Sequence, residues 1–228
     1  MSASPRTPQR RDHRFDLIVF DWDGTLMDST AMIASSIQRA CADLGLPVPS
    51  DERASHVIGL GLSDALAYAV PAMAKGQIPA MVERYRHHYL SRDHDLDLFP
   101  GVREIIVSLK ESGYFVAVAT GKSRVGLDRA LDVSGLRPLF DATRCADESR
   151  PKPDPEMLHE LSDELGVRAK RMLMIGDTTH DLMMATNAGA HSLAVSYGAH
   201  AARSLEGQGA LAIVGSPAQL GAWLAANA

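Results

Sequence analysis

The stretch "FDLIVFDWDGT", residues 15–25, joins an apolar run to two carboxylates. The run over residues 15–20 has the length and composition of a strand that is buried on both faces, which is typical of parallel sheets. Packing alone gives no reason to place Asp21 and Asp23 at the end of such a strand, because their like charges repel each other. Ligands of open α/β sheets bind beyond the carboxyl ends of the strands, so we expect this position to serve chemistry.

Short apolar runs alternate with helical patterns along most of the chain. Helical patterns cover residues 101–113, 123–135 and 154–166, and each ends on a glycine, which can adopt the left-handed conformation that terminates helices. The runs with strand character are residues 15–20, 114–120, 171–175, 192–195 and 210–214. This order predicts an α/β fold with a doubly wound parallel sheet, that is, a Rossmann-like core.

Residues 29–98 break this alternation, because they contain helical patterns and no strand pattern. The first of these helices is expected to begin at Ser29 or Thr30, either of which is a suitable capping residue. A block of about 70 residues is too long for a loop between a strand and a helix, so it should form a small helical domain over the sheet edge. We therefore expect a disordered tail of residues 1–14, a core of residues 15–28 and 99–228, and a helical cap of residues 29–98.

The composition argues against several classes of protein. The chain has 228 residues, 46% of them hydrophobic, which suits one core with a small insert. Its formal net charge of -5 gives no basic excess for nucleic acid. Its apolar runs are too short to span a bilayer, and its N-terminal segment lacks the apolar region of a signal peptide. The two cysteines form no CxxC pair, which favours reduced thiols. We expect a cytoplasmic protein without nucleic-acid or membrane partners, either a monomer or a weak homodimer.

Four groups of polar residues fall at expected strand ends or in the loops that follow them. Each has an ordinary explanation when taken singly, such as a helix cap or a solvated lysine. Together they should converge on one edge of the sheet, which predicts a functional site. The groups are Asp21 with Asp23, Thr120 with Gly121, Lys152 in "RPKPDP" (residues 150–155), and Asp177 with Asp181 in "GDTTHD" (residues 176–181).

Four segments resemble, in the family's order, the motifs of the haloacid dehalogenase-like hydrolase superfamily. They are "DWDGTLMDS" (21–29), "VAVATGK" (116–122), "RPKPDP" (150–155) and "GDTTHDLMMATNAGA" (176–190). The match spans nearly the whole chain after residue 14. The helical insert, with "HVIGLGLSDAL" (56–66) and "VSYG" (195–198), resembles the phosphoglycolate phosphatase-like branch.

This resemblance implies a Mg²⁺-dependent phosphatase that acts on a small phosphorylated metabolite, with 2-phosphoglycolate as the first candidate. In the family's chemistry Asp21 attacks phosphorus and becomes an aspartyl phosphate. Asp23 protonates the leaving oxygen and then takes a proton from the hydrolytic water. Thr120 and Lys152 hold the phosphoryl oxygens. The second aspartate separates the phosphatases of the superfamily from its dehalogenases, because a halide leaves without a proton.

The resemblance also implies the binding residues. Mg²⁺ suits an all-oxygen site with few protein ligands. Its ligands would be the Asp21 carboxylate, the Asp23 carbonyl and Asp177, with Asp181 either binding directly or lying behind them. Main-chain groups near Trp22 and Gly121 would hold the phosphate, Gly24 would let the chain turn beneath it, and the cap would contact the substrate through His56, Gly59 and Leu60. In the family's pattern the Lys152–Pro153 bond is often cis.

Other functions stay open at this point. A phosphomutase of the β-phosphoglucomutase type shares the nucleophile and the type of cap. A non-enzymatic signalling module that carries a phosphorylated aspartate also uses Mg²⁺, Thr and Lys, although the cap and Asp23 argue against it. Phosphonate hydrolysis needs a cap lysine, and the expected cap contains only Lys75, in an inter-helix turn.

Overall fold

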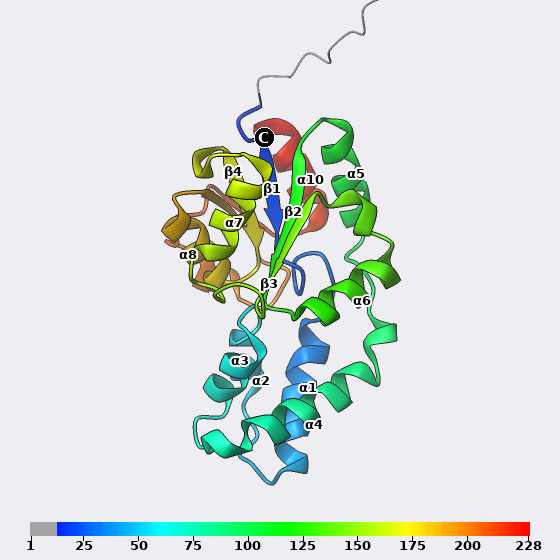
Figure 1. Ribbon diagram of the computed structural model, residues 1–228, viewed down its shortest axis with the longest axis vertical. Helices are drawn as coiled ribbons and strands as arrows, with labels where there is room; N and C mark the ends of the chain where they lie inside the picture. Colours follow the sequence, from blue (N-terminus) through cyan, green and yellow to red (C-terminus); the bar gives the residue numbers. More distant parts are fainter. Residues whose placement is uncertain (1–12) are drawn as a thin grey trace, which may run out of the picture.

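The computed structural model describes residues 13–228, which form a parallel sheet between two layers of helices, with further helices beyond one end of the sheet (Figure 1). The strands of this part pair in the order β3-β2-β1-β4-β5-β6, and every pair is parallel. The strands are β1 (Leu17–Phe20), β2 (Phe115–Thr120), β3 (Ala142–Cys145), β4 (Met172–Gly176), β5 (His191–Val195) and β6 (Ile213–Val214).

Ten α-helices occur in the described part of the chain. In chain order they are α1 (Thr30–Asp43), α2 (Asp51–His56), α3 (Leu62–Ala69), α4 (Ile78–Leu90), α5 (Val102–Glu111), α6 (Arg124–Ser134), α7 (Glu156–Leu165), α8 (Thr179–Ala188), α9 (Ala202–Leu205) and α10 (Pro217–Asn227). None of the helices described here combines the length and the apolar character that a membrane span requires.

Successive residues of the central strands pack into two different hydrophobic layers. In β1, Ile18 and Phe20 belong to the cluster that includes the apolar sides of α5, α6 and α10. Leu17 and Val19 belong to the cluster formed with α7 and α8. All four side chains are fully buried. Because the strand is covered on both faces, its sequence is apolar without alternation. The predicted doubly wound sheet is confirmed.

The strand that the sequence pattern missed is β3. Its sequence "ATRC" has no continuous apolar run, and Thr143 and Arg144 are only half-buried because the strand lies at the sheet edge. The expected helices correspond to α5, α6 and α7. Gly135 and Gly166 end the last two in the left-handed conformation, with φ of 64° and 66°.

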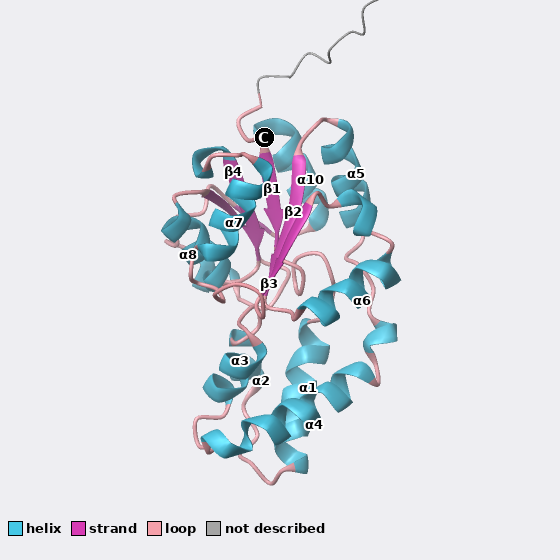
Figure 2. Cartoon of the chain, viewed as in Figure 1, coloured by secondary structure: helices cyan, strands magenta, loops and turns pink. Residues whose placement is uncertain are grey.

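Helices α1–α4, which we call the cap, lie between β1 and β2 in the chain (Figure 2). Helices α1, α3 and α4 share a hydrophobic cluster, in which Ile37, Leu66 and Met81 are almost completely buried. Ser29 occupies the N-cap position of α1, as expected, but its side chain makes no capping hydrogen bond. The predicted tail of residues 1–14 falls almost entirely outside the described residues.

The two segments that connect the cap to the core lie side by side. Met27 and Leu98 form an antiparallel bridge. The Asp28 N–H donates to the Asp97 carbonyl at 3.0 Å, and the Phe99 N–H donates to the Leu26 carbonyl at 3.0 Å. The cap therefore joins the core through a single two-stranded connection.

We expect Leu66→Ala to lower the free energy of unfolding of the cap by about 2–5 kcal/mol, because it leaves a cavity in the cap cluster. Amide hydrogen exchange, followed by mass spectrometry, should accelerate in α1, α3 and α4. Val48→Ala is the matched control, since Val48 in the cap is 54% exposed. Equal acceleration in β1 and β2 would contradict the separate packing of the cap.

Candidate active site

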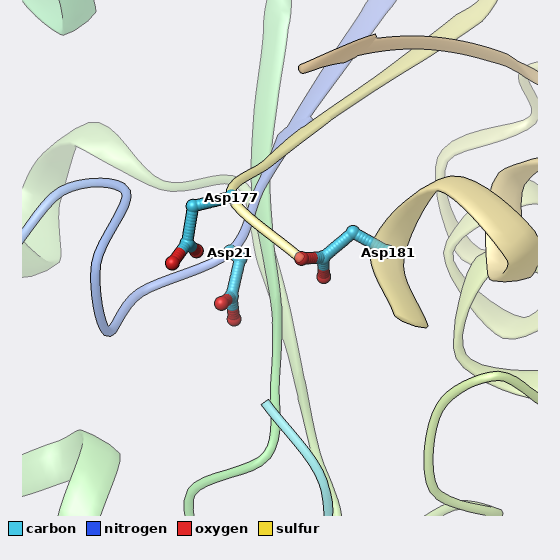
Figure 3. A group of neighbouring side chains, drawn as sticks. All are labelled: Asp21, Asp177 and Asp181. Carbon is cyan, nitrogen blue, oxygen red and sulfur yellow. The ribbon is translucent and has the colours of Figure 1, made fainter. Parts of the chain in front are cut away.

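Three carboxylates meet beyond the carboxyl ends of two adjacent strands (Figure 3). Asp21 follows β1, Asp177 follows β4, and Asp181 lies in the first turn of α8. Each residue offers an oxygen within 4.8 Å of the others, and all three side chains are buried. The parallel pairing of β1 with β4 explains the approach, because it continues into a hydrogen bond of 2.9 Å from the Asp21 N–H to the Ile175 carbonyl.

Lys152 lies inside this cluster, in the loop that leads from β3 to α7. Its Nζ donates to Asp21 Oδ1 at 2.7 Å and to Asp181 Oδ1 at 2.6 Å. Its side chain is fully buried. Burial acts to lower the pKa of this ammonium group, but the Asp181 and Asp21 carboxylates outweigh burial and hold the pKa above its ordinary value. The Lys152–Pro153 peptide bond is cis.

Neutral donors fix the other two carboxylates. Asp177 Oδ1 accepts from the Thr25 hydroxyl at 2.8 Å, and its Oδ2 accepts from the Ala199 N–H at 2.6 Å. Asp181 Oδ2 accepts from the N–H and the hydroxyl of Thr178 at 3.0 and 2.7 Å, as part of a capping box at the start of α8. Both side chains are therefore held in one orientation.

The backbone approaches Asp177 closely at two glycines. Gly24 has a φ of +80°, which favours glycine, and a Cβ there would overlap the Asp177 carboxylate. A Cβ at Gly198 would overlap the same carboxylate. The sharp turn expected at Gly24 therefore lies directly against the carboxylate cluster.

The cluster has the properties of a divalent-cation site. Asp21 Oδ2 is buried and has no hydrogen-bond partner. Burial, with a further contribution from Asp181, raises the pKa of Asp21 to about 7 in spite of Lys152. Burial and the neighbouring Asp21 also raise the pKa of Asp177. One ammonium group thus faces three carboxylates, and an ion such as Mg²⁺, which prefers oxygen ligands, fits this set.

Asp23 faces the cap rather than the other carboxylates. Its Oδ1 accepts from the Ser29 hydroxyl at 2.7 Å and from Lys122 Nζ at 3.0 Å. Lys122 Nζ also donates to the Tyr89 hydroxyl of α4 at 3.0 Å. No sequence pattern predicts either of these donors to Asp23. Lys122 directly follows Gly121 in the second motif, whereas Ser29 drew attention only as a helix cap.

The second motif forms the opposite wall of the site. Thr120 is fully buried at the end of β2, and its hydroxyl accepts from the Lys122 N–H at 3.2 Å. A side chain at Gly121 would overlap the carbonyl oxygens of Gly59 and Leu60 in the cap. The Trp22 side chain is fully buried in the hydrophobic core, so only its main chain faces this side of the sheet.

Two core histidines hold the cap against the site. His180 Nε2 donates to the His56 carbonyl at 3.1 Å, and His200 Nε2 donates to the same oxygen at 3.0 Å. His200 Nδ1 accepts from the Thr179 N–H at 3.1 Å, which places the ring proton on Nε2. No sequence pattern predicts these contacts, since they join segments far apart in the chain.

The cap residues expected to contact substrate therefore also contact the core. His56 lies against the two histidines, with its ring stacked on His200 at 4.8 Å between centroids. Gly59 lies against Thr178, and Leu60 lies against Gly121. Their role in substrate binding stays a prediction.

Comparisons with known proteins agree with this geometry. The family model for haloacid dehalogenase-like hydrolases matches residues 18–195. A protein named "Probable phosphatase IndB" from Dickeya dadantii is 36% identical over 196 residues, which cover 83% of this chain and 85% of the relative. The phosphoglycolate phosphatase of Aliivibrio fischeri is 35% identical over 191 residues, which cover 80% of this chain and 84% of the relative.

Solved structures show the same fold. The crystal structure of a predicted phosphoglycolate phosphatase from Haemophilus somnus has a TM-score of 0.80 and 26% sequence identity, covering 92% of this chain and 98% of that one. The family model covers well over half of the chain, and the motif resemblance is thereby confirmed. The chain belongs to the haloacid dehalogenase-like hydrolase family.

Proposed function

We propose that the protein is a Mg²⁺-dependent phosphatase that hydrolyses a small phosphate monoester through an aspartyl phosphate on Asp21. The observation that carries this proposal is the position of Asp21 at the end of β1. One of its oxygens is bound to Lys152, and the other is buried without a partner among the carboxylates. A buried, oriented carboxylate of this kind is suited to nucleophilic attack once its charge is offset.

The metal would be held by Asp21 and Asp177, with the Asp23 carbonyl as a further ligand and Asp181 beside them. When bound, Mg²⁺ would offset the negative charge of the phosphoryl group and of the carboxylates. Lys152 orients Asp21 and contributes a positive charge to the same region. Thr120 and the main chain near Trp22 and Gly121 would bind the remaining phosphoryl oxygens.

In this proposal Asp23 would act as the general acid and base. Ser29 and Lys122 both contact its Oδ1, which leaves Oδ2 as the oxygen for proton transfer. Protonation of the leaving alkoxide is needed for alkyl esters, since a free alkoxide is a poor leaving group. The same carboxylate would then accept a proton from the water that hydrolyses the aspartyl phosphate.

Helices α1–α4 would act as a mobile cap over the site. Asp21, Asp177 and Asp181 are at most 1% exposed, so substrate entry requires the cap to move. The natural hinges are the two connecting segments near Met27–Ser29 and Leu98–Gly101. Closure would exclude water during the first step.

The substrate proposed first is 2-phosphoglycolate, because a relative of 35% identity carries the name phosphoglycolate phosphatase. Cys41 and Cys145 are free and buried, which supports a reducing, cytoplasmic setting.

We expect Asp21→Asn to reduce kcat at least about 10³-fold without loss of fold, because the amide is no nucleophile. Phosphate release from a panel of phosphate esters measures kcat, and circular dichroism checks that the variant is folded. Asp163→Asn, at an exposed position of α7, is the control. Near-normal turnover by Asp21→Asn would refute the assignment of Asp21 as the nucleophile.

The wild-type assay also tests the alternative function. Isomerised sugar phosphate in place of free phosphate would indicate a phosphomutase.

We expect Asp23→Asn to lose about 10²–10⁴-fold in kcat with alkyl phosphates, because the leaving alkoxide then lacks its proton donor. An activated aryl phosphate should lose much less, since its leaving group needs no proton. The measurement is the ratio of kcat for the alkyl phosphate to kcat for the aryl phosphate, compared between the wild type and Asp23→Asn. Equal losses with both types would remove the acid role from Asp23.

Mg²⁺ binding should strengthen as the pH rises through about 7. The metal-free protein holds a proton on Asp21 below this pH, and the ion binds only the carboxylate form. Isothermal titration calorimetry should show an apparent Kd about tenfold lower at pH 8 than at pH 6. Asp177→Ala should abolish the binding signal. A pH-independent Kd would contradict binding of the ion to an Asp21 carboxylate with a pKa of about 7.

A further inference from the structure

Lys122 occupies the boundary between the cap and the general acid. Its Nζ lies 3.0 Å from Asp23 Oδ1 in the core and 3.0 Å from the Tyr89 hydroxyl in α4. It also lies 4.9 Å from the centre of the Tyr89 ring. The Lys122 and Asp23 side chains are only 11% and 10% exposed. Chain segments from the core and the cap thus enclose this ammonium group together.

The Lys122 side chain is a cation with an unused donor. Burial acts to lower its pKa, but Asp23, with the tyrosines Tyr89 and Tyr85, holds the pKa above its ordinary value. An ammonium group has three N–H donors. Two of them bind Asp23 and Tyr89, and the described residues offer no hydrogen-bond partner to the third.

The unused donor lies close to the expected position of the leaving group. A general acid must approach the leaving oxygen to about 2.6–3.2 Å. Lys122 Nζ lies 3.0 Å from the carboxylate of that acid. A substituent of the substrate that lies one or two bonds beyond the leaving oxygen would therefore be within reach of the Lys122 ammonium group. A neutral apolar group there would leave the third N–H of Lys122 without an acceptor, whereas a carboxylate would accept a charge-assisted hydrogen bond from it.

We propose that Lys122 is a specificity-determining residue, which binds a carboxylate on the carbon next to the ester oxygen and so selects short phosphorylated hydroxy acids. This inference rests on the proposed phosphatase function and adds the substrate class. Tyr89 presents the lysine from the cap side, so the selection operates when the cap is closed. Support of Asp23 alone would not require a cation, because Ser29 already donates to the same oxygen.

The test compares two esters that differ at one group. 2-Phosphoglycolate carries a carboxylate where 2-hydroxyethyl phosphate carries a neutral hydroxymethyl group, and both have primary alkoxide leaving groups. We expect wild-type protein to prefer 2-phosphoglycolate in kcat/KM. Lys122→Met should reduce this preference at least tenfold, chiefly through KM for 2-phosphoglycolate, while Lys122→Arg should retain most of it. Lys110→Met is the matched control, since Lys110 pairs with Asp141 at 2.6 Å at the opposite end of the sheet.

Each outcome bears on one assignment. Equal losses with both esters in Lys122→Met would overturn the inference, because Lys122 would then act only through Asp23. A wild-type protein that hydrolyses both esters equally well would also overturn it and would leave the phosphatase proposal intact. Absence of phosphate release from every ester, with Mg²⁺ present, would instead reject the phosphatase proposal itself. Thermal unfolding of Lys122→Met and Lys122→Arg separates a folding defect from these results.

Discussion

A buried ammonium group connects the parts of the site. Lys152 binds Asp21, which follows β1, and Asp181, which belongs to α8, at 2.7 and 2.6 Å. Removal of a charge from water costs several kcal/mol, and only close partners of opposite charge offset that cost. The converse also holds, because the three carboxylates within 4.8 Å of one another would repel each other without a cation. The placement of the loop between β3 and α7 is therefore a condition for the whole cluster.

The sheet makes this convergence possible because its strands are parallel. Groups from the ends of β1, β2 and β4 come to one edge without any local sequence contact between them. Phosphate monoester hydrolysis needs such a gathering, since enzymes accelerate it up to about 10²¹-fold and one well-placed donor supplies only about 3–4 kcal/mol. A nucleophile, an acid, a metal site and phosphate-binding groups must act together. Their number explains why so much of the site is charged and buried.

The parts that could be predicted from sequence follow rules of local pattern. Continuous apolar runs identified the buried strands, and carboxylates at strand ends identified Asp21 and Asp177 as neighbours. The four motifs then identified the family. The edge strand β3 escaped because its exposure leaves it polar. Lys122 escaped because its partners, Asp23 and Tyr89, come from the core and the cap, and no spacing in the chain records such a contact. The division of the chain at residues 29 and 98, and the roles of the cap residues, stay predictions.

The contact between His56 and the two core histidines has a consequence for how this protein can change. The shared acceptor is a main-chain oxygen with two lone pairs, and both accept a hydrogen bond here. Replacement of the residue at position 56 alters the stacked ring but cannot delete that oxygen. The side chain at position 56 can therefore change in evolution while the main-chain contact that joins this loop to the core is retained.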